Sequence, residues 1–439
     1  MNFNRTQIIV LGIIAVVVIV VVLGLLGIIP GIKKTTITDA NFPTGPVNLT
    51  IWGVGDDQTA FADTIKAYQD TYKNVKIDYK KFDDPATYLS ELVNALAENR
   101  GPDIFMVKSS WVFQQYGKMY PAPASVITSQ AVSQLFPGVV SKDFVLGGYV
   151  YALPLSMDAL TLIYNKDIFN SDAIVFPPTT WDEFVADVAK IRQVDSNKKI
   201  SLSATALGAA YNVDNLSDIL TVLALQSGSS INNTGNTGVT FDSVFSRVVQ
   251  FYTQFADPIS PYYTWNESFD NSVTAFSAGK TAMILDYYST LNDIKNRNAY
   301  LNYGVAALPQ VTTSDASQIA NRASYWGFAV SRQTANPYVS WNFINFLTTN
   351  PTYDSLYLQK AGKLPALLSL IYQGLGGDND VFLKEFLTAK TWYQADAFAT
   401  DSIWEEMIND ILSGKINLDG AVRAAETAMN KLYVPASTQ

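Results

Sequence analysis

"VNLTIWG" at residues 47–53 and "VKIDYKKF" at residues 75–82 decide the fold class of this chain. Both stretches alternate apolar and polar side chains with a period of two, which is typical of strands that bury one face. Between them, Phe61, Ile65 and Tyr68 recur at the spacing of one helix face. A strand, a helix and a second strand in this order form the unit of a parallel sheet with crossover helices.

The rest of the chain continues the pattern of short apolar strands and amphipathic helices. A helix is expected at residues 88–97, and Gly101 then marks the turn before a buried strand from Ile104. The Gly- and Asn-rich run at residues 228–238 predicts a surface loop, and two closing helices are expected from Asp401 onward. The sequence therefore predicts an α/β fold throughout, without a repeat period that would indicate a solenoid.

Composition excludes several kinds of site. The 439 residues, 48% of them apolar, are enough for two domains with substantial cores. A net charge of −9 and a pI near 4.7 disfavour a nucleic acid partner. The chain has no cysteine and no histidine, which excludes disulfides, thiolate or imidazole metal ligands and Ser-His-Asp triads.

The amino-terminal region has the pattern of a membrane segment. Residues 8–29 are apolar and uncharged, and at the helical rise they would span roughly 33 Å, about the thickness of the hydrocarbon core. We expect an uncleaved anchor here, preceded by a short segment at residues 1–7 and followed by a linker at residues 30–47 that contains several Pro and Gly residues. The alternative is a secretory signal removed near "TDA" at residues 38–40.

Six segments, in the same order, resemble a known family. They are "LTIWG" (49–53), "GPDIF" (101–105), "LPLSMDALTLIYNKDIF" (153–169), "TTWDEF" (179–184), "AFSAGKTAMIL" (275–285) and "NYGVAALP" (302–309). The family is that of the extracytoplasmic solute-binding proteins of ABC importers, in the carbohydrate-binding class that includes maltose-binding protein. The resemblance covers nearly all of the chain beyond the apolar segment.

The resemblance implies a type II periplasmic-binding-protein-like fold with a hinge between two α/β lobes. The first lobe would comprise residues 48–157 and about 328–368, and the second residues 158–327 and about 369–436. It also implies a monomer without a cofactor that binds a carbohydrate and passes it to ABC permease subunits. The binding domain would then lie outside the cell membrane, held by a single-pass amino-terminal anchor.

A sugar presents hydroxyl groups around its edge and C–H groups on its faces, so its site needs aromatic rings and hydrogen-bonding acids or amides. The candidate ligand contacts are Asp56, Asp57, Ser110, Trp111, Asp158, Tyr211, Trp265, Asp286, Tyr287, Tyr288, Tyr325 and Trp326. Asp56 and Asp57 follow the first strand, at the carboxyl edge where open α/β sheets bind ligands. An aspartate before a helix is also a common N-cap, which is the structural alternative for this pair.

The segment "DYYS" at residues 286–289 follows a short apolar strand of the expected second lobe. Its side chains would emerge at the carboxyl edge of that strand and face the gap between the lobes. The resemblance implies that an aromatic ring stacks on sugar at this turn. Because successive side chains of a strand point to opposite faces, we expect either Tyr287 or Tyr288 to do so, but not both. Asp158 would lie at the first crossing between the lobes, and Tyr211 would provide an aromatic platform in the second.

The remaining candidates also have structural alternatives. Ser110 and Trp111 follow the third strand and could equally pack the start of a helix. Trp265 is expected in a loop, where it would line the cleft or cover a helix. Tyr325 and Trp326, near the second crossing, would provide a platform or pack the hinge.

Three other functions compete with sugar binding. A glycoside hydrolase could use an acid pair such as Asp57 and Asp158, although the order of the motifs resembles that of binding proteins, and we expect no enzymatic activity. The tyrosines of "DYYS" and of "SPYYTW" (260–265) could instead bind ferric iron, although imidazole ligands are lacking. A tethered adhesion module would bind no small ligand. No metal site is expected, because no oxygen-rich loop has the spacing of a calcium loop.

Overall fold

The fold is taken from a computed structural model that describes residues 42–229, 231–311 and 318–433. The expected membrane segment at residues 8–29 lies outside the described residues, as do residues 1–7 and most of the expected linker. Within the described part of the chain, no helix combines the length and the apolar character needed to cross a bilayer. The description below concerns the unit that begins at Pro46.

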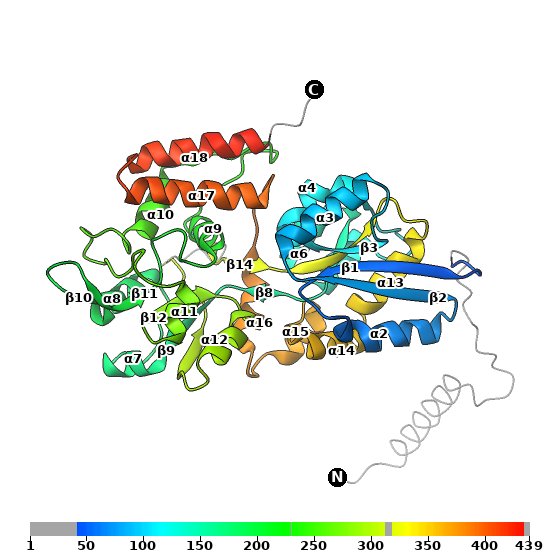
Figure 1. The fold of residues 1–439 in the computed structure, drawn as a ribbon, viewed down its shortest axis with the longest axis horizontal. Coiled ribbons are helices and arrows are strands. Elements are labelled where there is room, and N and C mark those ends of the chain that lie inside the picture. The colour runs from blue at the N-terminus through cyan, green and yellow to red at the C-terminus, as the bar shows by residue number, and fades with distance from the viewer. Residues whose placement is uncertain (1–41, 230, 312–317, 434–439) are drawn as a thin grey trace, which may run out of the picture. The chain divides into compact units, whose positions relative to one another are not determined.

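The predicted strand, helix and strand at the start of the chain are confirmed. They are β1 (Val47–Val54), α2 (Gln58–Thr71) and β2 (Val75–Phe82), and β1 pairs in parallel with β2 from Val47 opposite Val75 onward. The sheet continues in the order β2-β1-β3-β15-β4, and β7 also pairs with β15 (Figure 1). The bounds of the added strands are Ile104–Lys108 for β3, Met119–Tyr120 for β4, Ala152–Pro154 for β7 and Trp326–Ser331 for β15.

A second sheet has the strand order β10-β11-β12-β9-β13. Its strands are β9 (Thr161–Asn165), β10 (Gln193–Val194), β11 (Ile200–Thr205), β12 (Thr281–Asp286) and β13 (Tyr303–Ala306). All six residues of β12 are buried. Gly279, with φ of +70°, turns the chain from the preceding helix into this strand, and the missing Cβ allows that left-handed conformation.

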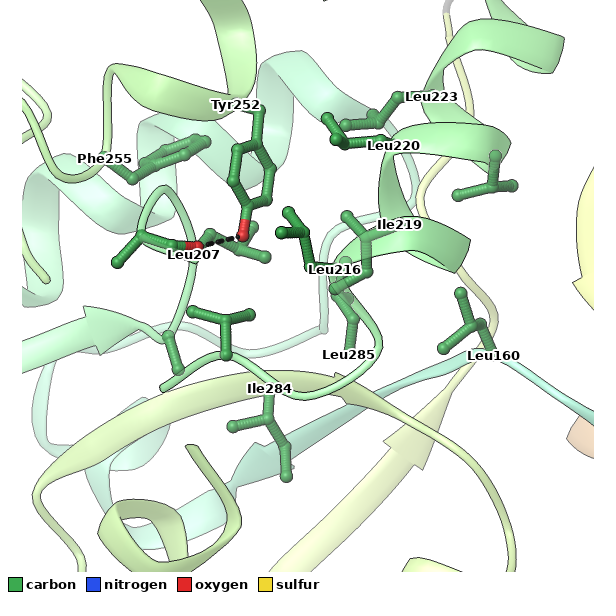
Figure 2. Packing of buried hydrophobic residues seen from close by; sticks show 14 of the residues in the cluster. Leu160, Leu207, Leu216, Ile219, Leu220, Leu223, Tyr252, Phe255, Ile284 and Leu285 are labelled. Atoms are coloured by element: carbon green, nitrogen blue, oxygen red, sulfur yellow. Dashed lines mark hydrogen bonds between the residues drawn. The ribbon is translucent and has the colours of Figure 1, made fainter. Parts of the chain in front are cut away.

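The core beside the second sheet is built from helices α9 (Leu216–Gln226) and α10 (Ser243–Thr253). Figure 2 shows Leu216 and Leu220 of α9 packed beside Tyr252 of α10. Tyr252 is completely buried, and its hydroxyl donates to the carbonyl oxygen of Ala209 at 2.7 Å. This bond satisfies the polar group that the ring brings into the core.

A small third sheet links the two larger ones. Its strands are β8 (Asp158–Ala159), β14 (Asn321–Ser324) and β16 (Ala389–Lys390). In the sequence, β8 lies between β7 of the first sheet and β9 of the second, and β14 lies between β13 of the second and β15 of the first. Because β8 and β14 pair antiparallel, with Ser324 opposite Asp158, the chain crosses between the sheets twice at the same place.

Helices surround the sheets as the apolar spacing predicts. Those near the first sheet include α3 (Pro85–Ala97), α4 (Val112–Gln115), α5 (Ser129–Leu135), α6 (Gly138–Phe144), α13 (Pro337–Thr349) and α14 (Pro351–Ala361). The remaining helices are α7 (Lys166–Ser171), α8 (Trp181–Ile191), α11 (Ser272–Ser277), α12 (Thr290–Arg297), α15 (Leu368–Gly374), α16 (Asp380–Thr388), α17 (Ala397–Leu412) and α18 (Leu418–Leu432). The two expected closing helices are therefore α17 and α18, which lie side by side (Figure 1).

The loop expected at residues 228–238 is only partly a surface loop. Ser229 and Ile231 are 4% and 2% exposed, so the prediction was wrong for these positions. The Asn232 side chain ties the loop inward, because its amide exchanges hydrogen bonds with the backbone of Tyr393 at 2.7 and 2.9 Å.

Candidate functional site

A cavity of about 280 Å³ lies where the two crossing strands meet the loops of both sheets. Its walls include Gly55 from the end of β1, Asp158 from β8 and Tyr288 from the loop after β12. The Asp158 carboxylate accepts hydrogen bonds from the backbone N–H groups of Tyr288 and Ser289, at 2.8 and 2.9 Å. The structure therefore brings together Asp158 and the "DYYS" segment, which are far apart in the sequence.

The environment of Asp158 changes its acidity. Burial raises the pKa of this carboxyl to about 6, and the N–H groups of Ser289 and Tyr288 limit the rise because they favour the charged form. Each carboxylate oxygen has more than one lone pair, so Asp158 can accept a further hydrogen bond from a ligand hydroxyl while it keeps its backbone donors.

The two tyrosines of "DYYS" have different surroundings. Tyr287 is 7% exposed, and its hydroxyl donates to Oδ2 of Asp218 at 2.8 Å. Burial raises the pKa of Tyr287 well above its usual value. Tyr288 is partly exposed, and its ring meets the edge of Phe382 with centroids 5.2 Å apart. Both residues line the cavity, and Tyr288 is the more exposed of the two.

Asp286 lies behind the cavity and not in its lining. It is 2% exposed, and Oδ1 accepts hydrogen bonds from Thr290 Oγ1 at 2.6 Å and from Asn215 Nδ2 at 3.0 Å. Oδ2 has no hydrogen-bond partner among the described residues. Burial raises the pKa of Asp286 to about 6. This carboxyl therefore acts as a brace for the turn after β12, and its predicted contact with ligand does not fit this position.

We expect Asp286→Asn to change how stability depends on pH. Because the folded-state pKa of about 6 lies above the usual 3.8, the folded chain holds a proton that the unfolded chain has lost, and stability falls as pH rises from about 4 to about 6. The difference between the two pKa values corresponds to roughly 3 kcal/mol at most. The asparagine retains Oδ1 and does not ionise, so urea unfolding should show the variant gaining stability over wild type across this pH range. A difference that stays constant with pH would contradict the assignment.

A second cavity, of about 320 Å³, adjoins the first. It is lined by Ser110, Trp111 and Trp326, and the two indole rings meet edge to face with centroids 4.9 Å apart. Trp111 also contacts Phe398 of α17, with ring centroids 5.7 Å apart. Trp111 is 3% exposed, whereas Ser110 and Trp326 are partly exposed, and ligand contact by these three residues stays a prediction.

Tyr325, between β14 and β15, is held in place by contacts at the second crossing between the sheets. It lines the first cavity but is 2% exposed, and its hydroxyl donates to Oδ2 of Asp143 at 2.6 Å. The ring also packs against Phe144, with centroids 5.2 Å apart. Of the adjacent aromatic pair at the second crossing, Tyr325 mainly packs the hinge, while Trp326 is partly exposed.

Asp56 and Asp57 are not in the linings of these two cavities, although Gly55 is. Asp56 is buried, with an ion pair to Lys363 at 2.5 Å. Asp57 precedes α2 without capping it through its side chain, and its exposed carboxylate pairs with Lys81 at 3.2 Å. The Asp56 carboxylate is therefore used in the ion pair with Lys363. Asp57 lies outside the cavity that contains Asp158.

Two aromatic candidates lie elsewhere. Trp265 is completely buried, stacked on Phe269 with centroids 4.5 Å apart, and its indole N–H donates to Oδ1 of Asn212 at 3.0 Å. Its predicted ligand contact is wrong for this structure, because the ring and its polar atom are both used by the core. Tyr211 is 59% exposed, but its hydroxyl donates to the Glu267 carbonyl oxygen at 2.7 Å, and it is outside both linings.

The sequence analysis missed the polar residues of the second cavity. They include Lys108 at the end of β3, Asp218 on α9, Arg322 on β14, Gln394 in the segment before α17 and Asp401 on α17. No local pattern marks them, because each comes from a different element. Among the described residues, no group of three acidic side chains is placed to hold a metal ion.

Arg322 and Asp218 form an ion pair beneath this cavity. Nε of Arg322 lies 2.8 Å from Oδ1 of Asp218, and the two side chains are 5% and 18% exposed. Burial acts to raise the pKa of Asp218, but the charges of Arg322 and Lys108 hold it below its usual value. Tyr287 donates to the other carboxylate oxygen, so this pair links the crossing strand β14 to α9 and to the turn after β12.

Comparison with known proteins gives the family. Residues 53–354 match the family of bacterial extracellular solute-binding proteins. A protein of Brucella abortus (strain 2308) described as a binding protein is 24% identical over 280 residues, which are 63% of this chain and 65% of that protein. The maltotriose-binding protein of Pyrococcus abyssi is 22% identical over 296 residues, 63% of this chain and 57% of that one. The match thus spans less than two thirds of the length of these relatives.

The structural comparison agrees with the sequence comparison. The sugar-binding protein MalE of Xanthomonas citri superimposes with a TM-score of 0.73 at 17% identity, over 88% of this chain and 97% of the other. At this identity the likeness shows the fold, which is the two-lobed α/β fold expected from the sequence. Because the family match covers well over half of its residues, the chain belongs to the bacterial extracellular solute-binding proteins.

Proposed function

We propose that this protein captures a carbohydrate between two lobes outside the cell membrane and delivers it to an ABC transporter permease. The observation that carries the proposal is the cavity at the crossing strands, where an acceptor carboxylate, Asp158, lies near the partly exposed rings of Tyr288 and Trp326. Aromatic faces suit the C–H faces of a sugar, and a carboxylate suits its hydroxyl groups. The family and the maltotriose-binding relative support this reading.

The lobes proposed are those built around the first and second sheets, divided near residues 157, 327 and 368. We propose that residues 8–29 anchor the chain in the membrane and that the monomer faces the outside. The uncharged apolar run supports the anchor, and family membership supports the orientation.

The proposed mechanism is closure about the hinge. Each cavity has walls from both sheets, so a ligand bound there contacts both lobes. Such a ligand favours the closed arrangement by the contacts that it makes only in that arrangement. No covalent step is proposed, because Asp57, the acid that would pair with Asp158 in a glycoside hydrolase, is outside the cavity lining that contains Asp158.

The test is ligand-dependent stability of the full-length chain. Neutral mono- and oligosaccharides should be screened by thermal unfolding, and one of them at a hundredfold its dissociation constant should add about 2.7 kcal/mol to the free energy of unfolding. Tyr288→Ala should then weaken binding about tenfold by calorimetry, or roughly 1.4 kcal/mol, because it removes a ring from the wall.

Tyr300→Ala is the matched control. Tyr300 is 98% exposed and is not part of the linings described, so its loss should leave affinity unchanged. If no carbohydrate stabilises the chain, the proposed function is wrong.

A further inference from the structure

A third cavity, of about 420 Å³, continues the site beyond α4. Its lining includes Phe113 and Lys142 near the first sheet, Asn232 in the loop at residues 228–238, and Trp392 and Tyr393 before α17. The Phe113 and Tyr393 rings meet edge to face with centroids 3.7 Å apart. Nearby, Gln114 Nε2 donates to Oδ2 of Asp396 at 3.0 Å. This cavity too therefore has walls from both sides of the crossing.

The three cavities adjoin one another in a row. The second cavity shares Pro85, Ser324 and Trp326 with the first, and it shares Ser110 and Gln394 with the third. The first and third linings have no residue in common. Shared walls on both sides of the second cavity place the three cavities next to one another, and we refer to this row as the groove, with Tyr288 in the cavity at one end and Tyr393 in the cavity at the other.

The groove is too large for a single sugar ring. Sites for drug-sized ligands typically measure roughly 300–1,000 Å³; the first cavity, at about 280 Å³, lies just below this range, and the second and third, at about 320 and 420 Å³, lie within it. Each also carries aromatic side chains: Tyr288 and Trp326 in the first, Trp111 and Phe398 in the second, Phe113 and Tyr393 in the third. Repeated rings along a groove suit a ligand that repeats its own apolar faces.

The charges of the groove nearly balance, because the three linings together hold four cations and five acids, Asp83, Asp158 and Lys363 being those of the first cavity. In the second and third cavities the charged lining residues are the cations Lys108, Lys142 and Arg322 and the acids Asp143, Asp218 and Asp401. Arginine is the side chain best suited to bind phosphate or carboxylate groups, but Arg322 is held by Asp218. In the first cavity, Lys363 is held by Asp56 in the same way.

From these observations we propose that the ligand is an uncharged, linear oligosaccharide of at least three rings that extends along all three cavities. This inference rests on the proposed function and adds length and charge to it. The aromatic side chains would contact successive ring faces, and the charged side chains of the linings would serve as donors and acceptors for hydroxyl groups. A monosaccharide would occupy part of the groove, and an anionic ligand would find no unpaired arginine there.

The test is a length series. Calorimetry with the full-length chain should use the maltodextrin, cello-oligosaccharide and manno-oligosaccharide series, from the monosaccharide to the pentasaccharide. In the series that binds, we expect affinity to rise at least tenfold between the disaccharide and the longer members. Phe113→Ala should reduce that gain to about threefold or less, because it removes a ring at the far end of the groove. Tyr300→Ala should retain the full gain, and both variants should be checked for an unchanged melting temperature.

The outcomes separate the two proposals. Binding with equal affinity for short and long members, or a Phe113→Ala variant that retains the whole gain, would overturn the extended ligand while leaving sugar binding intact. Glucose 6-phosphate and oligogalacturonides test the charge, and tighter binding of either than of its neutral counterpart would overturn the uncharged ligand. Absence of binding to every carbohydrate would contradict the proposed function itself.

Discussion

Arg322→Met should lower the free energy of unfolding by about 3 kcal/mol or more. The substitution removes the partner of a largely buried carboxylate, since Arg322 Nε lies 2.8 Å from Oδ1 of Asp218. It also removes the hydrogen bond from the guanidinium to Oγ1 of Thr391 at 3.1 Å. Asp218 would then keep Tyr287 as a donor but lose its closest cation, and a buried charge without a cation is costly. Urea unfolding of the ligand-free chain measures the loss.

Two further variants isolate the ion pair. Asp218→Asn combined with Arg322→Met should recover part of the loss, because no uncompensated charge then remains. Lys66→Met breaks a pair with Asp70 in which the two side chains are 75% and 53% exposed, and it should leave the free energy of unfolding nearly unchanged. If Arg322→Met costs no more than Lys66→Met, the pair does not stabilise the crossing strands.

Local patterns in the sequence were sufficient to predict β1, β2 and β3, which are three of the six strands of the first sheet. Val47, Leu49 and Ile51 are buried while Asn48 and Thr50 are exposed, so the alternation along β1 reports directly which face is covered. The helix between the strands buries Phe61, Ile65 and Tyr68 for the same reason. Such patterns depend on residues a few positions apart, which is why they can be found in one chain without a structure.

Part of the site could be predicted because it lies at strand ends. Tyr288 follows β12, and the carboxyl ends of strands are where α/β sheets bind ligands. Asp158 begins β8 and was predicted instead from the resemblance to the family. The partners of the second cavity could not be found in this way. Lys108 and Asp401 come from β3 and α17, and only the packing of the two sheets around the crossing brings such distant elements together.

The aromatic candidates show a different limit. From the sequence, Trp265 is expected in a loop and Trp326 near the second crossing between the lobes. Both side chains are large rings with one polar N–H group. In the structure, the Trp265 indole is completely enclosed and its N–H is bound to Asn212, whereas Trp326 is partly exposed between two cavities. The difference is set by neighbours such as Phe269, which stacks on Trp265. Residue type alone does not distinguish a ring of the core from a ring of the site.

Trp265→Ala should therefore destabilise the protein without weakening its ligand binding. Removing a completely buried tryptophan leaves a cavity and the unpaired Oδ1 of Asn212, which should cost about 3–5 kcal/mol in urea unfolding. Trp265→Phe retains most of the ring and should cost markedly less. Calorimetry on the folded fraction, at a temperature where the variant remains folded, should give the wild-type dissociation constant for the best-binding oligosaccharide. Trp326→Ala should show the opposite balance, with a larger loss of affinity than of stability, because its ring borders both cavities. If Trp265→Ala instead reduces affinity while the free energy of unfolding hardly changes, Trp265 contacts the ligand and the burial seen here belongs to another conformation of the chain.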